Sequence, residues 1–238
     1  MSAFGRQPYP LATLIIISLI KKYKMQHKNK ITTLFLDIGG VLLSDGWGPE
    51  FRQLAAEKFN LDLAELEERH NIMFVTFGEG KITLEEYLNR VVFYKKRDFS
   101  LNEFREFMFS LTTPYPDMIA FIKKLKVQNK LKIVAVSNEA RELNAYRIQT
   151  FKLNSLIDFF VSSCYVHVRK PDTAIFKLAL DTARVTAAEV VYIDDVKIFT
   201  DIAKDLEIKS IHHTDWQSTS ETLADMGLLV ENNKLVHA

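Results

Sequence analysis

Small groups of polar residues follow short apolar runs of the sequence, at the point where each run ends. They are Asp37, the pair Ser137 and Asn138, the pair Arg169 and Lys170, and the pair Asp194 and Asp195. Two or three carboxylates can hold a hard cation such as Mg²⁺, which prefers oxygen ligands. A hydroxyl and backbone N–H groups bind phosphoryl oxygens, and a lysine neutralises the remaining negative charge. Brought together, these residue types are suited to phosphoryl transfer.

Asp37 is the candidate nucleophile of this set. An aspartate beside a cation and a lysine stays ionised, and an ionised carboxylate can act as a nucleophile. Gly39 and Gly40 follow it, and glycines let the backbone turn closely past a ligand. Asp194 and Asp195 follow the apolar run VVYI, where two carboxylates are costly without a cation or a base nearby. Taken singly, each feature also fits a turn, a helix cap or a solvated loop, so the ordered set carries the prediction.

The predicted strands and helices explain how such residues can meet. Strands are predicted at 31–37, 131–138, 158–163, 190–195 and 209–213, and helices at 116–127, 139–151, 172–183, 197–206 and 217–226. Alternation of this kind is typical of an α/β fold with a doubly wound parallel sheet covered by helices on both faces. Because the carboxyl ends of parallel strands share one edge of the sheet, we expect the polar residues to converge on one crevice there.

Residues 48–113 interrupt this alternation. They contain no convincing strand and four helix-compatible segments, which are EFRQLAAEKF, LAELEERHNIMFVTF, TLEEYLNRVVFYKK and LNEFREFMFSL. Ser100 with Glu103 has the pattern of a helix N-cap. We therefore predict an inserted helical cap at 48–113, and an α/β core formed by 31–47 and 114–238. Trp47, in the loop that leads to the cap, is expected either to gate entry to the crevice or to be a hinge anchor that packs on the cap, and we favour the hinge anchor.

Composition limits the class of function. The chain has 238 residues, of which 47% are hydrophobic and 26% charged, enough to bury a core. A formal net charge of +1 supplies no basic excess for a nucleic-acid backbone, so no nucleic-acid partner is expected. Cys164 is the only cysteine, which excludes an internal disulfide and a cysteine-rich zinc site. A reducing, cytoplasmic location is therefore predicted.

The first thirty residues differ from the rest of the chain. The apolar run LATLIIISLI at 11–20 precedes Lys21, Lys22 and Lys24. It is too short to span a membrane, which takes about 20 apolar residues, and no small-residue cleavage site follows it. A weak membrane-surface anchor, a secretion signal and a non-native or dispensable extension all stay open. We favour the last, with Met25 as the functional start, so membrane contact is expected only if residues 1–30 belong to the working protein.

The ordered motifs resemble those of the haloacid dehalogenase (HAD) superfamily. LFLDIGGVL is similar to its first motif, VAVSN to its second, VRKPD to its lysine motif and VVYIDD to its acidic motif, so the resemblance spans about 33–213. SSCYVHVRKPDTAIF is similar to the subfamily with a helical cap inserted after the first motif. The resemblance implies a Rossmann-like core and a hydrolase. Its substrate would be a small phosphorylated metabolite, and its intermediate an aspartyl-phosphate.

Carried over by position, the resemblance assigns a role to each motif residue. Asp37 would be the nucleophile, and Lys170 would steady both Asp37 and the phosphoryl charge. Ser137 would bind the phosphoryl group, with Asn138 beside it. The Mg²⁺ ligands would be Asp37, the backbone carbonyl of Gly39, Asp194 and Asp195.

The sequence departs from the family pattern at Gly39. Phosphatases of the superfamily usually carry a second aspartate at this position, which protonates the leaving group and later activates water. Loss of a general acid or base commonly costs roughly 10²–10⁴-fold in rate. Three routes stay open: a substrate with a good leaving group, water acting alone, or a stand-in such as Asp45 or His167.

Two alternatives to a phosphatase also stay open. A 2-haloacid dehalogenase of the same superfamily attacks carbon, lacks the second aspartate and needs no metal. The pair Asp194 and Asp195 argues against it, because two ionised carboxylates beside Asp37 require a cation. A catalytically silent scaffold that binds phosphate or regulates a partner is favoured by Gly39 and opposed by the intact nucleophile, lysine and acidic pair. Metal dependence and turnover separate the three hypotheses.

Overall fold

The predicted α/β alternation is present in the computed structural model, which describes residues 30–230. The five strands are β1 (Thr33–Leu36), β2 (Lys132–Ser137), β3 (Phe159–Ser162), β4 (Val190–Asp194) and β5 (Lys209–His212). They form one parallel sheet in the order β3-β2-β1-β4-β5. The chain builds outward from β1 to β3 on one side and then crosses to β4 and β5 on the other. The predicted doubly wound sheet is therefore confirmed.

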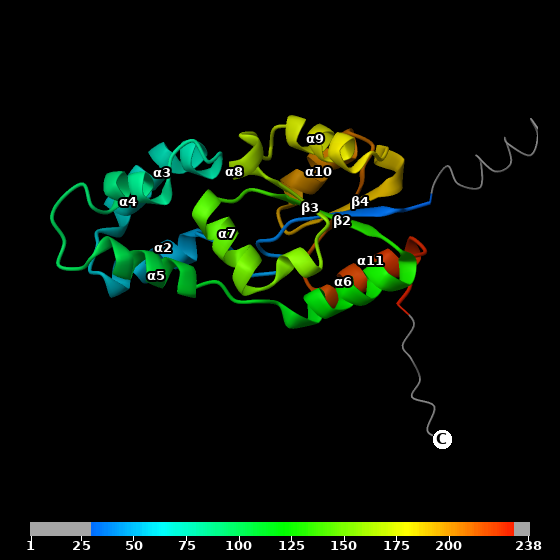
Figure 1. The fold of residues 1–238 in the computed structure, drawn as a ribbon, viewed down its shortest axis with the longest axis horizontal. Coiled ribbons are helices and arrows are strands. Elements are labelled where there is room, and N and C mark those ends of the chain that lie inside the picture. The colour runs from blue at the N-terminus through cyan, green and yellow to red at the C-terminus, as the bar shows by residue number, and fades with distance from the viewer. Residues whose placement is uncertain (1–29, 231–238) are drawn as a thin grey trace, which may run out of the picture.

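Helices cover both faces of this sheet (Figure 1). α6 (Pro116–Asn129), α7 (Arg141–Thr150) and α11 (Trp216–Asp225) pack on one face, and α9 (Ala174–Ala183) and α10 (Lys197–Asp205) pack on the other. A single turn, α8 (Ser163–Val166), and 3₁₀ turns at Leu153–Ser155 and Ala187–Glu189 complete the connections. The sequence did not predict α8, because a four-residue helix is too short to show a helical period.

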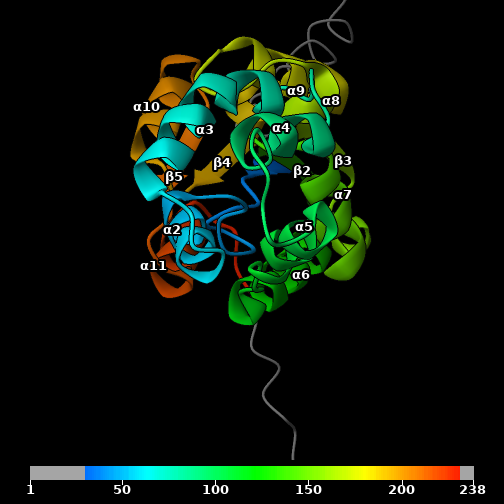
Figure 2. The same cartoon turned by 90° about the vertical axis from the view of Figure 1, so that its left-hand side faces the viewer.

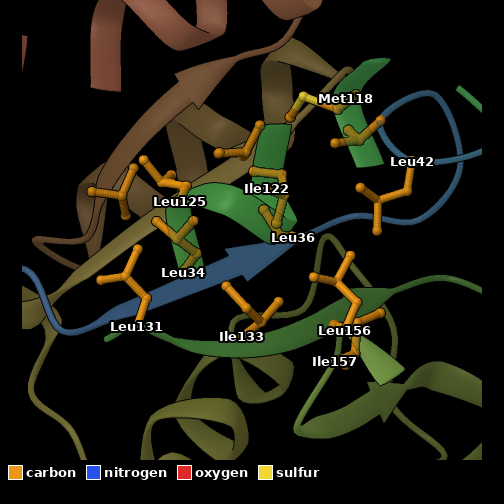
Figure 3. Packing of buried hydrophobic residues seen from close by; sticks show 14 of the residues in the cluster. Leu34, Leu36, Leu42, Met118, Ile122, Leu125, Leu131, Ile133, Leu156 and Ile157 are labelled. Atoms are coloured by element: carbon orange, nitrogen blue, oxygen red, sulfur yellow. The ribbon is translucent and has the colours of Figure 1, made fainter. Parts of the chain in front are cut away.

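Side chains of β1 alternate between the two hydrophobic layers. Leu34 and Leu36 belong to the cluster that includes Ile122 of α6, and Figure 3 shows them on that side of the sheet. Phe35 faces the opposite layer, where it joins Phe176 of α9. Because both faces are buried, the central strand is a continuous apolar run, which is the pattern that identified it in the sequence.

Four helices follow β1 in the sequence and precede α6. In space they lie beyond the carboxyl ends of the strands (Figures 1 and 2). They are α2 (Pro49–Lys58), α3 (Leu63–Gly78), α4 (Leu84–Val91) and α5 (Leu101–Ser110). Residues 48–113, all within the described part of the chain, contain no strand. The expected capping box at α5 is present, since Ser100 Oγ accepts from Glu103 N at 3.2 Å and Ser100 N donates to the Glu103 carboxylate at 2.7 Å.

The helical insertion packs around its own hydrophobic cluster, in which Tyr87, Leu88 and Phe104 are fully buried. That cluster also includes Ala140 and Leu143, at the start of α7. The insertion is thus seated on a helix that belongs to the sheet layers. The division into a cap at 48–113 and a core at 31–47 and 114–238 stays a prediction.

Trp47 ties the loop after β1 to the insertion. Its indole Nε1 donates to the Tyr87 hydroxyl at 2.9 Å, and its ring packs edge-to-face on Phe104 with centroids 5.9 Å apart. The Tyr87 hydroxyl in turn lies 2.7 Å from Nδ1 of His70, which is 4% exposed. Trp47 therefore has the contacts expected of a hinge anchor. Burial, together with the charge of Arg52, lowers the pKa of His70 to about 4, so the ring is neutral.

Among residues 30–230, no helix is both long enough and apolar enough to cross a membrane. The predicted extension at 1–30 lies outside the described residues, apart from Lys30. The three interpretations of this segment remain predictions from the sequence.

We expect His70 to make stability depend on pH. Below pH 6.5 the unfolded chain takes up a proton at His70 that the folded protein excludes down to about pH 4, so stability falls as the pH falls through this window. His70→Gln lacks this proton. Relative to that variant, the wild type should lose up to about 3 kcal/mol of unfolding free energy between neutral pH and pH 4.

Urea unfolding across the pH range measures this difference. His167→Gln, at an exposed histidine, is the matched control and should keep the wild-type pH dependence. If His70→Gln and the wild type lose stability in parallel, His70 is not the group responsible.

Candidate active site

The polar residues predicted from the strand ends meet at the carboxyl edge of the sheet. Asp37 follows β1, Ser137 ends β2 and Asp194 ends β4. β1 lies between β2 and β4, so Asp37 has one of these residues on each side. Lys170 reaches them from the loop between α8 and α9. This edge is the point where the strand order reverses, which is where open α/β sheets bind their ligands.

The Lys170 ammonium lies at the centre of the site and is fully buried. It donates to Asp37 Oδ2 at 2.9 Å and to Asp194 Oδ2 at 2.6 Å. The Tyr192 hydroxyl lies 3.1 Å from the same nitrogen and also bonds to the Asp194 carboxylate. Burial opposes the charge, but the two carboxylates outweigh it and raise the pKa of Lys170 above its usual value. The lysine is therefore a fixed positive charge beside Asp37.

The second oxygen of Asp37 is held by two donors. The backbone N–H of Ile38 donates to Oδ1 at 2.7 Å, and Ser137 Oγ donates to it at 2.6 Å. Hydrogen bonds to a charged acceptor are short and directional, so they fix the orientation of the carboxylate. Asp37 is 8% exposed and lines the cavity above the strand ends, so a substrate can reach it.

Asn138 holds the lysine loop. Its Nδ2 donates to the backbone carbonyl of Lys170 at 2.9 Å, and its Oδ1 accepts from the Lys170 N–H at 2.9 Å. The side chain therefore positions Lys170, a role that the sequence did not predict. Asn138 also lines the cavity, where the sequence predicts contact with the substrate.

The acidic residues have the composition of a site for a divalent cation. Asp37, Asp194 and Asp195 each offer a carboxylate oxygen, and these atoms all lie within 4.8 Å of one another. Burial, with Asp37 and Asp194 nearby, raises the pKa of Asp195 to about 7. One buried ammonium, that of Lys170, does not offset three carboxylates. The residues therefore fit Mg²⁺, which takes oxygen ligands and would relieve this repulsion. Gly39, whose carbonyl is the remaining predicted ligand, lines the same cavity.

Gly40 makes room for the Asp195 carboxylate. Its φ is +68°, in the left-handed region that favours glycine. A Cβ atom at this position would collide with both carboxylate oxygens of Asp195. The second glycine of DIGG is thus required both by its conformation and by the space that Asp195 occupies.

A cavity of about 390 Å³ lies between the strand ends and the insertion. Its acidic end is formed by Asp37 and Asp195, and its aromatic side chains are Trp47, Phe74, Phe77 and Phe199. Arg169, one of the residues singled out in the sequence, lines the cavity and lies over Phe74, with its guanidinium carbon 4.0 Å from the ring centroid. The cavity thus combines a polar end, where phosphate chemistry is possible, with an apolar wall.

The two stand-ins considered for the missing second aspartate are placed differently. Asp45 lines the cavity together with Asp37, and desolvation and the Asp37 charge both raise the pKa of its carboxyl. His167 is exposed, and its Nδ1 lies 2.7 Å from the backbone carbonyl of Glu79, at the end of α3. The structure therefore brings Asp45, and not His167, to the acidic end of the cavity.

Sequence reasoning missed a buried ion pair beside the site. Arg147 Nη1 donates to Glu139 Oε1 at 2.7 Å, and both side chains are buried. Arg147 Nη2 also donates to the backbone carbonyl of Ser44 at 2.6 Å, which ties α7 to the loop after β1. No signal in the sequence identifies this pair, because a glutamate and an arginine in a helical segment usually lie on a solvated face.

Comparisons with known proteins agree with this arrangement. A family model described as haloacid dehalogenase-like hydrolase matches residues 31–196, well over half of the chain. A chloroplast protein from Arabidopsis thaliana, flavin mononucleotide hydrolase 1, is 24% identical over 213 residues, which cover 89% of this chain and 84% of that protein. A bifunctional epoxide hydrolase 2 from Sus scrofa is 40% identical over 60 residues, which cover 25% of this chain and 11% of that protein.

Solved structures share the fold. A HAD family enzyme from Bacteroides thetaiotaomicron in complex with magnesium superposes with a TM-score of 0.68 at 22% identity, covering 79% of this chain and 98% of that one. An L-2-haloacid dehalogenase from Xanthobacter autotrophicus with covalently bound chloropropionic acid gives 0.56 at 15% identity, covering 87% and 92%. At these identities the likeness establishes the fold, and the chemistry has to be argued from the site itself.

Gly40→Ala should weaken Mg²⁺ binding, because the new Cβ would displace the Asp195 carboxylate. Gly227→Ala is the matched control, since Gly227 also has a positive φ of +86° but has no atom within 4 Å of an added Cβ. Each variant should lose about 1–2 kcal/mol of stability from the left-handed backbone. Only Gly40→Ala should also lose the rise in melting temperature that Mg²⁺ gives the wild type.

Thermal unfolding with and without Mg²⁺ measures both effects. A Gly40→Ala protein whose melting temperature rises with Mg²⁺ as much as that of the wild type would show that Asp195 is not a ligand.

Proposed function

The chain belongs to the haloacid dehalogenase-like hydrolases, and we propose that it is a Mg²⁺-dependent phosphatase of a small phosphorylated metabolite. The observation that carries this proposal is the buried Lys170 ammonium, bonded to both Asp37 and Asp194 with Asp195 beside them. It supplies a nucleophile, a fixed positive charge and an acidic metal site within one crevice. A related structure from Bacteroides thetaiotaomicron, at 21% identity, contains magnesium and inorganic phosphate, which is consistent with this chemistry.

In the proposed reaction, Asp37 attacks phosphorus, the bond to the leaving oxygen breaks, and an aspartyl-phosphate forms. Lys170 remains charged throughout and offsets the negative charge of the transferred group. Ser137, whose hydroxyl bonds Asp37, is placed to bind a phosphoryl oxygen. Mg²⁺ held by Asp37, Asp194, Asp195 and the Gly39 carbonyl would neutralise further charge on the phosphoryl oxygens. Water then hydrolyses the aspartyl-phosphate and restores Asp37.

The acidic cluster also separates this proposal from its alternatives. A dehalogenase needs no metal, whereas three carboxylates whose oxygens lie within 4.8 Å of one another favour a bound cation. A silent scaffold needs no nucleophile, whereas Asp37 is held by two donors and a lysine and still lines the cavity. Both observations support the metal-dependent hydrolase.

For the substrate, we propose a phosphate monoester that carries a flat apolar group. The cavity volume of about 390 Å³ leaves room for such a group between the acidic end and the aromatic wall. Phe74 lines the cavity and is 42% exposed, so part of its ring remains available to a ligand beside the Arg169 guanidinium. Flavin mononucleotide, which the Arabidopsis relative hydrolyses according to its name, belongs to this class of molecule.

The proposal includes a reducing, cytoplasmic location, without a nucleic-acid partner. It rests on the net charge of +1 and on the single cysteine. Cys164 is buried, and burial raises its pKa to about 12, so the thiol is protonated and unreactive at neutral pH.

The wild type should release phosphate from p-nitrophenyl phosphate, sugar phosphates or acyl phosphates in the presence of Mg²⁺, and lose this activity in chelator. Asp37→Asn should lower kcat by more than about 10³-fold, because an amide is a poor nucleophile. Asp205→Asn, an exposed aspartate at the end of α10, is the control and should keep full activity.

The alternatives have their own signatures in the same assay. A folded wild type that binds Mg²⁺ and phosphate without turning over any ester would favour the silent scaffold. Metal-independent release of halide from a 2-haloacid would favour the dehalogenase.

Phe74→Ala should raise KM for an aromatic phosphate ester about fivefold, the equivalent of one lost aromatic contact of about 1 kcal/mol. KM for acetyl phosphate, which has no aromatic group, should not change. Ile72→Ala is the matched control, because Ile72 lies on the same helix, is 70% exposed and does not line the cavity. Steady-state kinetics on both substrates measure the split, and an equal rise in KM for both would mean that Phe74 does not select for an aromatic group.

A further inference from the structure

We infer that Asp45 is the general acid and base of this site, and that its carboxylate takes the place of the side chain that Gly39 lacks. The inference rests on the proposed phosphatase function and adds the residue that moves the protons. It follows from three features of the structure: the side chains in the cavity that are engaged elsewhere, the position of Asp45 beside Gly39, and the contacts that hold its loop.

The reaction needs a proton donor in the cavity. When the bond between phosphorus and an alkyl or phenyl oxygen breaks, the leaving group carries a negative charge that a nearby acid must neutralise. The Lys170 ammonium is fully buried and donates to two carboxylates, so it is not available to the leaving group. Asp37 is the nucleophile, and Asp195 belongs to the metal site. The donor therefore has to come from the remaining lining of the cavity.

Most other ionisable side chains of that lining are engaged elsewhere. Arg147 pairs with Glu139 at 2.7 Å, and both are buried. Arg52 pairs with Glu67 at 2.6 Å. His70 is buried among the helices of the insertion. Arginine keeps its proton at any pH at which the protein is folded, so Arg169 is also unsuitable as a proton donor. Among the described residues that line the cavity, Asp45 is the carboxylic acid that stays free for this role.

Asp45 is placed where the missing side chain would be. A Cβ built on Gly39 would lie 3.2 Å from Asp45 Oδ1, so a side chain at position 39 would extend into the space that this carboxylate fills. Asp45 lines the same cavity as Asp37 and Asp195. It is also exposed, so both a leaving group and a water molecule can reach it. The Asp45 carboxylate thus faces the cavity that also contains the nucleophile Asp37, where the substrate would bind.

The loop that carries Asp45 is held on both sides. The Ser44 carbonyl accepts from Arg147 Nη2 at 2.6 Å, and the Ser44 N–H donates to the Thr113 carbonyl at 2.8 Å. At Gly46 an added Cβ would lie 2.8 Å from Arg147 Nη1, so the guanidinium packs directly against the backbone. A general acid has to be held close to its productive position, and these contacts provide that positioning.

The protons balance over the two half-reactions. In the first, Asp37 forms a bond to phosphorus, the bond to the leaving oxygen breaks, and protonated Asp45 gives its proton to that oxygen, which leaves as an alcohol. In the second, water attacks phosphorus and gives a proton to the Asp45 carboxylate as the bond to Asp37 breaks. Inorganic phosphate leaves, and both aspartates return to their initial state.

Asp45→Asn should have an effect that depends on the leaving group. Phenyl phosphate and p-nitrophenyl phosphate have similar shapes, but only phenolate, the poorer leaving group, requires a proton. The value of kcat/KM reports the steps up to release of the leaving group. It should fall about 10²–10³-fold for phenyl phosphate and less than about threefold for p-nitrophenyl phosphate. Glu57→Gln, at an exposed acidic residue on α2, is the control and should change neither value.

A second variant moves the carboxylate to the neighbouring position. Asp45→Gly should lose phenyl phosphate turnover, and the double variant Asp45→Gly, Gly39→Asp should recover at least about tenfold of it. Gly39 lies outside the left-handed region of φ, so an aspartate is compatible with its backbone. Recovery would show that the reaction needs a carboxylate at this position. A merely structural role of Asp45 would not explain such a recovery.

Two results would overturn the inference alone. They are equal losses of kcat/KM for both esters in Asp45→Asn, and undiminished turnover of phenyl phosphate by that variant. If the wild type turns over neither ester, the proposed phosphatase function fails and the inference fails with it. The behaviour of the wild type on p-nitrophenyl phosphate therefore distinguishes the two failures.

Discussion

The burial of one ammonium group constrains the whole site. Lys170 has no exposed surface, and moving a charge out of water costs several kcal/mol unless partners replace the lost solvation. Those partners are Asp37 after β1 and Asp194 at the end of β4, at 2.9 and 2.6 Å. They meet the same nitrogen only because β1 and β4 are adjacent and in register, with Leu36 paired to Ile193. Sheet register and site electrostatics thus depend on each other.

The fold could be predicted from the sequence because the centre of the sheet is buried on both faces. The three inner strands, β1, β2 and β4, are short apolar runs, and the crossover helices have apolar residues at helical spacing, so type and order could be predicted. Boundaries were less certain: the first strand was predicted at 31–37 and runs from Thr33 to Leu36. Where a run is short, as in the four-residue helix Ser163–Val166, no period exists to detect it.

Only some residues of the site could be predicted from the sequence. Asp37, Ser137, Asp194 and Asp195 stand out because each follows a buried run, and parallel strands bring such positions together. The hydrogen bonds of Asn138 to the Lys170 backbone join segments 32 residues apart, so no spacing in the sequence predicts them. Glu139 and Arg147 are close in sequence, but residues of these types usually lie on a solvated helix face, so the sequence did not predict their buried pair. Which of Asp45 and His167 lies in the cavity was likewise a question of distance, and only the three-dimensional structure shows that Asp45 does.

The α7 helix serves two hydrophobic clusters at once. Leu143 joins the cluster of the insertion, and the ring of Tyr146 stacks on Phe109 of α5 with centroids 4.8 Å apart, while Ile148 packs on the cluster under the sheet. For protein engineering, this means that the insertion is not an exchangeable cassette. Replacing it with another helical module would expose an apolar face of α7 to solvent. That face would therefore have to be redesigned together with the new module.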